Sequence, residues 1–328
     1  MTARPVNRFL IFAPNWLGDA VMALPALADV RRALPSDTKV VVAARRSVAA
    51  LFGMVRDVDE VISVTDGREL RDRFAVAILL PNSFRSALLA SRARIPERWG
   101  YRTQCRGALL TRAIYPPPHI QHQVDSYRRL VAALGFPNGG SEPSLDVGAG
   151  IRDAAARALA SAGWNRTTPL VALAPGAAYG SAKQWPPEYF AELARALTDD
   201  GLQPILVGSA ADEPTVRAIE GSLGAGVALN LAGKTDVPML AGVLALSRAL
   251  VSNDSGAMHL GAAVGTPVTA VFGPTNEQLT APRGEGRHAV LTHAVWCRPC
   301  MLRECPLDHQ CMRGIGVARV LESTRRIL

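Results

Sequence analysis

The alternation of short β-branched segments with amphipathic segments is the feature that most limits how this chain can fold. Residues 9–13 are typical of a buried strand, and residues 19–34 follow with apolar side chains at helical spacing. The succession of strand, loop and helix returns after further predicted strands at 39–43, 60–64 and 76–80. Such alternation predicts βαβ units, in which the strands of a sheet run parallel.

The alternation pauses after a predicted helix at 124–134 and then resumes. Later strands are predicted at 170–174, 204–207, 249–252 and 268–272, with helices at 151–162, 187–196, 212–223, 238–246 and 255–264. We therefore predict an α/β protein with two Rossmann-like domains, 1–140 and 151–328, joined by a linker at 141–150; the second carries a Cys-rich segment at 297–311 and a C-terminal helix. Two such domains facing each other would form a cleft between the carboxyl ends of their sheets, where ligands bind.

Positive charge is concentrated in the first half of the chain. Residues 1–150 hold 20 basic and 13 acidic side chains, whereas residues 151–328 hold 16 and 15. The densest part, residues 85–112, contains a single acid and seven arginines: Arg85, Arg92, Arg94, Arg98, Arg102, Arg106 and Arg112. This charge fits nucleic acid, a membrane surface, an acidic substrate or simply a solvated face. Aromatic residues make up only 5% and are not interleaved with the arginines, which argues against a nucleic-acid-binding protein.

The apolar runs and the cysteines indicate the cellular compartment in which the protein is expected. No run approaches the roughly 18 residues of a membrane span, and the chain enters its first predicted strand without a signal segment. We therefore expect a cytoplasmic protein. Four of the five cysteines, Cys297, Cys300, Cys305 and Cys311, fall within residues 297–311 together with His309. In a reducing cytosol such a cluster is either a structural metal site, zinc or iron–sulfur, or a loop of free thiols.

Three loops between a strand and a helix have unusual compositions. In the first, residues 14–19, Asp19 is either a helix cap or a general base at the end of a strand. In the second, residues 174–187, small residues let backbone N–H groups approach an anion, and Lys183 supplies a charge or is merely solvated. Its spacing matches neither a Walker loop nor the glycine fingerprint of dehydrogenases, and residues 14–19 lack that fingerprint too, which disfavours an NAD-dependent enzyme.

The third loop, residues 252–259, precedes a predicted helix. Asp254 or Ser255 is expected to cap that helix, whose N-terminus suits a pyrophosphate. His259 either reaches the same ligand or is a hydrogen-bonded structural residue.

Taken together, these loops resemble glycosyltransferase family 9, the ADP-heptose:lipopolysaccharide heptosyltransferases. The resemblance rests on residues 13–22, 80–87, 175–186, 208–209 and 253–256 together with His259. It implies a GT-B glycosyltransferase that inverts the anomeric centre without a metal or other cofactor in the chemical step. It also implies that Asp19 is the base and that Lys183 neutralises the leaving diphosphate. The remaining donor residues implied by position are Ala177, Ala178, Ser209, Asp254, Ser255, Gly256 and His259.

The acceptor implied by the resemblance is the anionic lipid A–core glycolipid at the inner face of the membrane, to which arginine forks are suited. The expected acceptor residues are Asn15, Trp16, Gly18, Asn82, Ser83, Arg85, Arg94, Arg98 and Arg102. The sequences Pro-Asn-Trp-Leu-Gly-Asp and Leu-Pro-Asn-Ser-Phe favour the second inner-core transfer, from ADP-heptose to the first core heptose. Another heptose transfer of the family is the alternative.

Overall fold

The computed structural model describes residues 8–224 and 226–328, which form two compact units divided between Pro143 and Ser144. The predicted linker, 141–150, spans this division, although its last two residues already belong to helix α6. Each unit contains one six-stranded sheet whose strands are all parallel. The α/β class predicted from the alternation is therefore confirmed.

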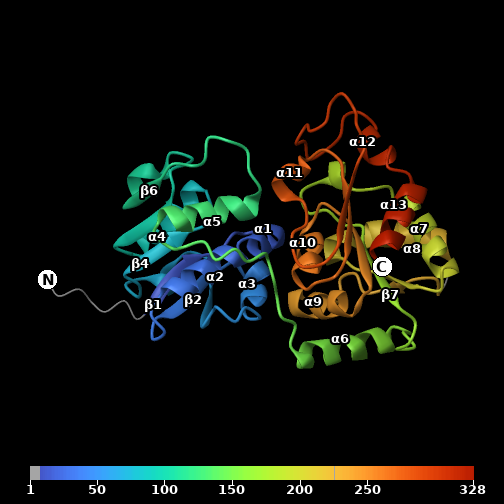
Figure 1. Ribbon diagram of the computed structural model, residues 1–328, viewed down its shortest axis with the longest axis horizontal. Coiled ribbons are helices and arrows are strands. Elements are labelled where there is room, and N and C mark those ends of the chain that lie inside the picture. The colour runs from blue at the N-terminus through green and yellow to red at the C-terminus, as the bar shows by residue number, and fades with distance from the viewer. Residues whose placement is uncertain (1–7, 225) are drawn as a thin grey trace. The chain divides into compact units, whose positions relative to one another are not determined.

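The N-terminal unit has the strand order β3-β2-β1-β4-β5-β6 (Figure 1). Its strands are β1 (Arg8–Phe12), β2 (Lys39–Ala44), β3 (Glu60–Ser63), β4 (Val76–Leu79), β5 (Glu97–Tyr101) and β6 (Arg112–Ile114). Its α-helices are α1 (Leu17–Met22), α2 (Leu24–Ala33), α3 (Arg46–Phe52), α4 (Phe84–Arg92) and α5 (Gln123–Ala133), with short 3₁₀ turns η1 (Arg68–Leu70) and η2 (Arg106–Leu109).

The C-terminal unit has the order β12-β11-β10-β7-β8-β9. When its strands are numbered from β7 and the order is read from the β9 edge, the topology is the same as that of the N-terminal unit. Its strands are β7 (Leu170–Ala174), β8 (Gln203–Leu206), β9 (Leu229–Asn230), β10 (Ala249–Asn253), β11 (Val268–Phe272) and β12 (His288–Thr292). Its helices are α6 (Ala149–Ser161), α7 (Pro187–Asp199), α8 (Glu213–Leu223), α9 (Val237–Leu246), α10 (Gly256–Ala263), α11 (Glu277–Thr280), α12 (Gln310–Arg313) and α13 (Val317–Ile327), with 3₁₀ turns η3 (Ser181–Lys183) and η4 (Ala210–Asp212).

This strand order fixes where ligands are expected. The chain reverses direction across the sheet between β1 and β4 in one unit and between β7 and β10 in the other. Ligands of doubly wound sheets bind beyond the carboxyl ends of the strands at such a switch point. The loops that follow these four strands are therefore the places to look for function.

Two departures from the predicted elements have local causes. The single helix expected at 19–34 is divided into α1 and α2 at Ala23, because Pro25 lacks the N–H that would continue the first helix. Strands β5 and β6 were not predicted, since their charged residues hide the apolar alternation of a strand. Of the two, β6 is the edge strand, where charged side chains are common.

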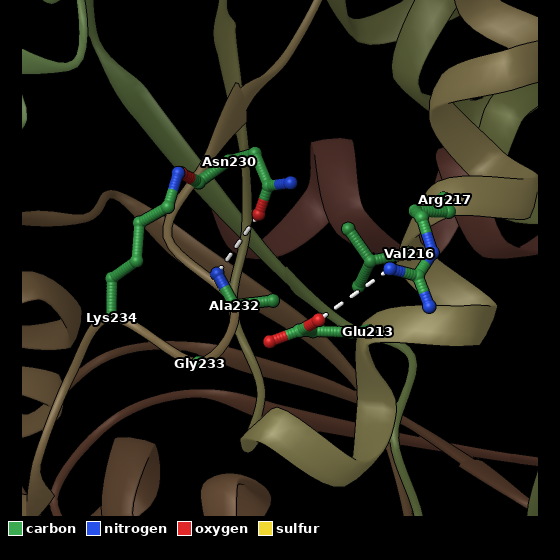
Figure 2. Close-up of a pocket in the computed structure, with 7 residues that line it drawn as sticks. All are labelled: Glu213, Val216, Arg217, Asn230, Ala232, Gly233 and Lys234. Carbon is green, nitrogen blue, oxygen red and sulfur yellow. Dashed lines mark hydrogen bonds and ion pairs between the residues drawn. The ribbon is translucent and has the colours of Figure 1, made fainter.

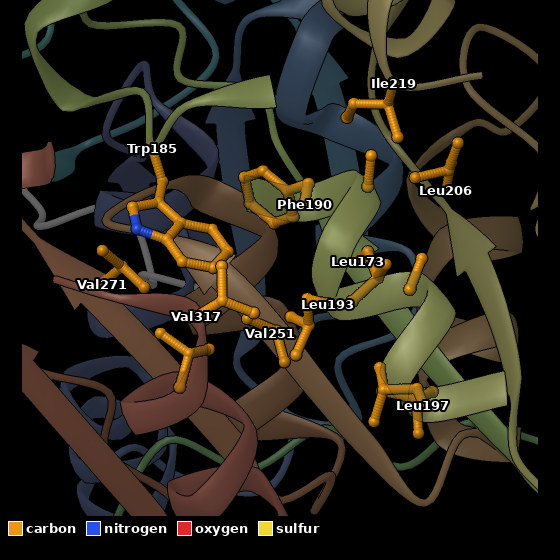
Figure 3. Close-up of a cluster of buried hydrophobic side chains, with 14 of the residues drawn as sticks. Leu173, Trp185, Phe190, Leu193, Leu197, Leu206, Ile219, Val251, Val271 and Val317 are labelled. Carbon is orange, nitrogen blue, oxygen red and sulfur yellow. The ribbon is translucent and has the colours of Figure 1, made fainter. Parts of the chain in front are cut away.

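The core of the C-terminal unit fixes the end of the loop that follows β7. Trp185, at the end of the loop after β7, is fully buried among residues of α7, β10 and β11 (Figure 3). Its indole N–H donates to the Ile315 carbonyl at 2.8 Å, which joins the loop to the segment before α13.

In the described part of the chain, no helix has the length and apolarity needed to cross a membrane.

Candidate functional site

The switch point of the C-terminal unit carries a buried ion pair. The Lys183 ammonium donates to Asp254 Oδ2 at 2.5 Å, and the two side chains are only 13% and 5% exposed. The Thr275 hydroxyl donates to the same carboxylate oxygen at 2.7 Å. Lys183 lies in the loop after β7 and Asp254 directly follows β10, so the sheet topology brings together two residues 71 positions apart.

Asn253, the last residue of β10, holds both ends of the loop that carries Lys183. Its amide nitrogen donates to the Pro175 carbonyl at 2.7 Å, and its amide oxygen accepts the Trp185 N–H at 3.1 Å. Because Asn253 is fully buried, both bonds are shielded from water. The loop from Pro175 to Trp185 is thus closed at its base by one side chain of the neighbouring strand.

The start of the same loop is crowded against the loop after β8. A side chain at Gly176 would put its Cβ 2.3 Å from the Asp212 carboxylate. Asp212 in turn accepts the Ser209 N–H and hydroxyl at 2.8 and 2.7 Å, forming a capping box at η4. Ser209, which was predicted to bind ADP-heptose, therefore lies beside the loop that begins at Gly176. Ala177 is buried there, and Ala178 is exposed.

The helix that follows Asp254 begins differently from the prediction. Asp254 is not its cap, because the carboxylate is occupied by Lys183 and Thr275. Ser255 is at the N-cap position of α10, but its hydroxyl lies 3.0 Å from the Ser252 hydroxyl and makes no capping bond. The first N–H groups of α10, beginning at Gly256, are thus left without a side-chain cap. His259 is buried in the first turns of this helix.

A pocket that the sequence did not reveal lies at the same edge of the sheet (Figure 2). Its lining residues come from the start of α8 and from the turn after β9: Glu213, Val216, Arg217, Asn230, Ala232, Gly233 and Lys234. Glu213 Oε1 would lie 2.9 Å from a Cβ at Gly233, and the Lys234 ammonium donates to the Asn230 carbonyl at 2.9 Å. Scattered polar residues of two elements gave no motif from which the pocket could have been predicted.

In the N-terminal unit, Asp19 lies inside α1 rather than at its cap, which is Trp16. The expectation that Asp19 caps the helix is therefore wrong. Its carboxylate lies near buried Tyr127: burial raises the pKa of the Tyr127 phenol well above its usual range, and the Asp19 charge adds to this. Trp16 is 56% exposed, and Gly18, between the two, is half-buried.

The switch point of the N-terminal unit also carries a pocket. It is lined by the ends of β1, β2 and β4 and the start of α4: Phe12, Ala13, Asn15, Ala43, Ala44, Arg45, Val64, Thr65, Pro81, Ser83, Arg85, Ser86 and Leu89. Asn15, Ser83 and Arg85 were predicted as acceptor residues, and the fold brings them into one pocket. Arg45 was missed because it follows a strand for which no motif was recognised.

The arginines between 85 and 112 do not form one surface. Arg106 is fully buried; it donates to the carbonyls of Pro81 and Tyr101, and burial lowers the pKa of its guanidinium to about 10. Arg98 donates to the carbonyls of Leu109, Ile95 and Pro96, the last at 2.9 Å. These two guanidinium groups hold the loops around β5 together.

The other arginines predicted for the acceptor are exposed. Arg102 donates to the Tyr115 hydroxyl at 2.6 Å and lies over its ring. Arg94 lies 3.9 Å from the Asp72 carboxylate. Asn82, also predicted for the acceptor, accepts the Thr103 hydroxyl at its carbonyl and the Arg106 guanidinium at its amide oxygen.

The predicted metal site at the cysteines is not supported. Among the residues that the structure describes, no group of three or more His, Cys, Asp or Glu side chains is placed to hold a metal ion. The thiols are free, and Cys305 Sγ accepts the N–H groups of Leu307 and His309 at 3.4 and 3.3 Å. Burial raises the pKa of Cys311, and the three other thiols nearby raise it further.

Two Rossmann-like units are the architecture of the GT-B glycosyltransferases, and this chain shares it with a solved heptosyltransferase. The family model for glycosyltransferase family 9 (heptosyltransferase) matches residues 65–310. This chain belongs to glycosyltransferase family 9.

Individual relatives agree with the family. Lipopolysaccharide heptosyltransferase 2 of Salmonella typhimurium is 31% identical over 98% of both chains. Its namesake from Escherichia coli is 30% identical over the same shares. The solved structure of the E. coli ADP-heptose lps heptosyltransferase II superposes with a TM-score of 0.86, at 29% identity and with 98% of each chain covered.

Proposed function

We propose that this glycosyltransferase catalyses the second heptose transfer of the lipopolysaccharide inner core. In that reaction, the first core heptose of a heptosyl-Kdo2-lipid A acceptor receives heptose from ADP-heptose. The observation that carries the proposal is the Lys183–Asp254 pair at the switch point, within a fold whose full-length relatives are named heptosyltransferase 2. The role of each residue follows from its surroundings.

The donor is proposed to bind along the carboxyl edge of the C-terminal sheet. The ammonium of Lys183 and the uncapped N–H groups at the start of α10 suit a diphosphate, which loses the sugar and leaves as ADP. Asp254 fixes the ammonium in place and leaves its other hydrogens for the ligand. The pocket around Glu213 is proposed for the nucleoside, since a carboxylate accepts hydrogen bonds from ribose hydroxyls.

The acceptor is proposed to bind at the carboxyl edge of the N-terminal sheet. Asn15 and Ser83 offer hydrogen bonds there, while Arg45 and Arg85 suit a phosphate or carboxylate of the glycolipid. Asp19, in the first turn of α1, is proposed to take the proton from the attacking hydroxyl. Exposed Arg94 and Arg102, with Trp16, remain candidates for the outer part of the acceptor. Arg98 is less suited, because carbonyls of its own loop already occupy it.

One assay tests the reaction and the step. Purified protein is incubated with ADP-heptose and with acceptors that carry no heptose or one heptose, and product is measured by mass. We expect transfer to the one-heptose acceptor. Transfer only to the acceptor without heptose would assign the first inner-core step instead, and no transfer to either would contradict the proposal.

The same assay tests the base. Asp19→Asn should lower kcat by a factor of about 10²–10⁴ because the attacking hydroxyl loses its proton acceptor. Asp37→Asn, which changes an exposed carboxylate between α2 and β2, is the matched control and should retain activity. Full activity in Asp19→Asn would remove Asp19 from the role of base.

A further inference from the structure

The Cys-rich segment, residues 297–311, is fixed against the loop that carries Lys183 and against the loop after β11, whose Thr275 binds Asp254. On one side, the Tyr179 hydroxyl donates to the Met301 carbonyl at 2.7 Å, and the Ala182 N–H donates to the Arg303 carbonyl at 3.0 Å. On the other side, the Met301 N–H donates to the Pro274 carbonyl at 2.9 Å. The backbone of this segment therefore contacts the loop that carries Lys183, although none of the residues predicted to bind ADP-heptose lies in the segment.

Arg298 anchors the same segment next to Asp254. Its guanidinium donates to the carbonyls of Gly273 and Thr275 at 2.7 and 3.2 Å and forms an ion pair with Glu277. Thr275 is the residue whose hydroxyl binds the Asp254 carboxylate. Residues 298–303 are consequently held at both ends, and a side chain projecting from them has a defined starting point.

Arg303 starts directly against the Lys183 loop. A Cβ at Gly180 would lie only 2.2 Å from the Arg303 carbonyl oxygen, so the two backbones approach each other more closely than any side chain at position 180 would allow. The close approach is made at the base of η3, whose last residue is Lys183. A glycine at this point is what lets the segment dock.

Two cations share the ring of Tyr179. The Lys183 ammonium lies 4.8 Å from the ring centroid, and the Arg303 guanidinium carbon lies 5.3 Å from it. Asp254 balances the charge of Lys183. Arg303 is exposed and, within the described residues, makes no ion pair. The ring attracts each cation, and one unit of positive charge is left over beside the proposed diphosphate site.

We propose that Arg303 binds the donor diphosphate together with Lys183, with Tyr179 positioning both cations. This rests on the proposed function, in which Lys183 faces the diphosphate. The planar guanidinium can donate two parallel hydrogen bonds to phosphate oxygens, which a lysine ammonium cannot do. The Cys-rich segment is then the scaffold that presents this arginine, which gives it a role that needs no metal at its thiols.

The test is calorimetric binding of ADP to purified full-length variants. Arg303→Gln should weaken ADP binding roughly tenfold or more, because a hydrogen-bonded charge on the phosphate is lost. Arg303→Lys should recover only part of this loss, and the KM for ADP-heptose should rise more than kcat falls. Arg326→Gln, on the exposed face of α13, is the matched control and should bind ADP as the unaltered protein does.

Three further variants separate the possible failures. If Lys183→Gln weakens ADP binding while Arg303→Gln does not, the role of Arg303 is overturned and the proposed donor site stands. If neither variant changes the affinity, the placement of the diphosphate itself is wrong. Tyr179→Leu, which removes the shared ring, should weaken ADP binding, whereas Tyr179→Phe should retain most of the affinity; equal affinities in both would contradict the positioning role. Circular dichroism melting of each variant checks that it is folded.

Discussion

Each unit buries a cation against the loop that follows its fourth strand, β4 or β10, and the two cations are balanced in different ways. In the C-terminal unit, Lys183 is neutralised by the carboxylate of Asp254. In the N-terminal unit, Arg106 lies beneath the loop after β4 and is surrounded by carbonyls of Pro81 and Tyr101 and the hydroxyl of Ser86. One cation thus lies at the proposed diphosphate site, while the other supports a loop. The topology of the sheet therefore determines where a buried charge lies, and the groups around the charge determine its role.

Removing Lys183 should have the largest effect. Lys183→Met leaves the Asp254 carboxylate buried with only the Thr275 hydroxyl, which should lower the free energy of unfolding by about 3 kcal/mol. ADP binding should fall at the same time, since Lys183 is the ammonium proposed to face the phosphates. Chemical denaturation and calorimetry measure the two effects, with Lys39→Met, at an exposed position, as control. An unchanged ADP affinity would show that the pair is structural, as Arg106 is.

Removing Arg106 should have a smaller effect, confined to the N-terminal unit. Arg106→Met leaves two carbonyls and a hydroxyl without their donor, at a cost of about 2 kcal/mol in the free energy of unfolding. The loop that carries Ser83 and Arg85 loses its support, so the KM for the acceptor should rise while ADP affinity stays the same. Steady-state kinetics with each substrate in turn distinguish these. A loss of ADP affinity equal to that in Lys183→Met would break the proposed division of labour.

Lowering the pH should have the smallest effect and should act on the C-terminal unit. Burial lowers the pKa of His288 on β12, so the unfolded chain binds this proton more readily than the folded chain. The contribution is fully present above the ordinary histidine pKa, near 6.5, and is lost as the pH falls below it toward the lowered value. The loss should be small, and His288→Gln should abolish it. Denaturation curves at several pH values measure it, and an equal slope in both proteins would exclude His288.

The sequence predicted most of the fold, and it singled out the candidate functional loops but not the contacts within them. Strands 170–174 and 268–272 were predicted with the bounds that the structure has, because buried parallel strands are continuous apolar runs. The loops after β7 and β10 stood out by composition. That Asp254 binds Lys183 rather than capping α10 depends on which loops the sheet brings together, and a local pattern carries no such information.

Charge runs were the weakest guide. The arginines between 85 and 112 looked like one docking surface, yet the strands β5 and β6 run through them and turn Arg98 and Arg106 toward carbonyls of the protein. The cysteines likewise suggested a metal from spacing alone, whereas the described structure holds free thiols in a segment whose backbone carries the contacts. In both cases, residue type indicated chemistry but the backbone decided where the side chains went.

The amide of Asn253 has a consequence for how such enzymes diversify. Since one buried side chain binds Pro175 at one end and Trp185 at the other, the residues between them form a loop whose two ends are fixed independently of its contents. Positions 177–184 can therefore be changed without disturbing the sheet, provided that Lys183 and the residues that contact the Cys-rich segment are kept. A library confined to those positions would be a direct route to transferases that accept other nucleotide sugars.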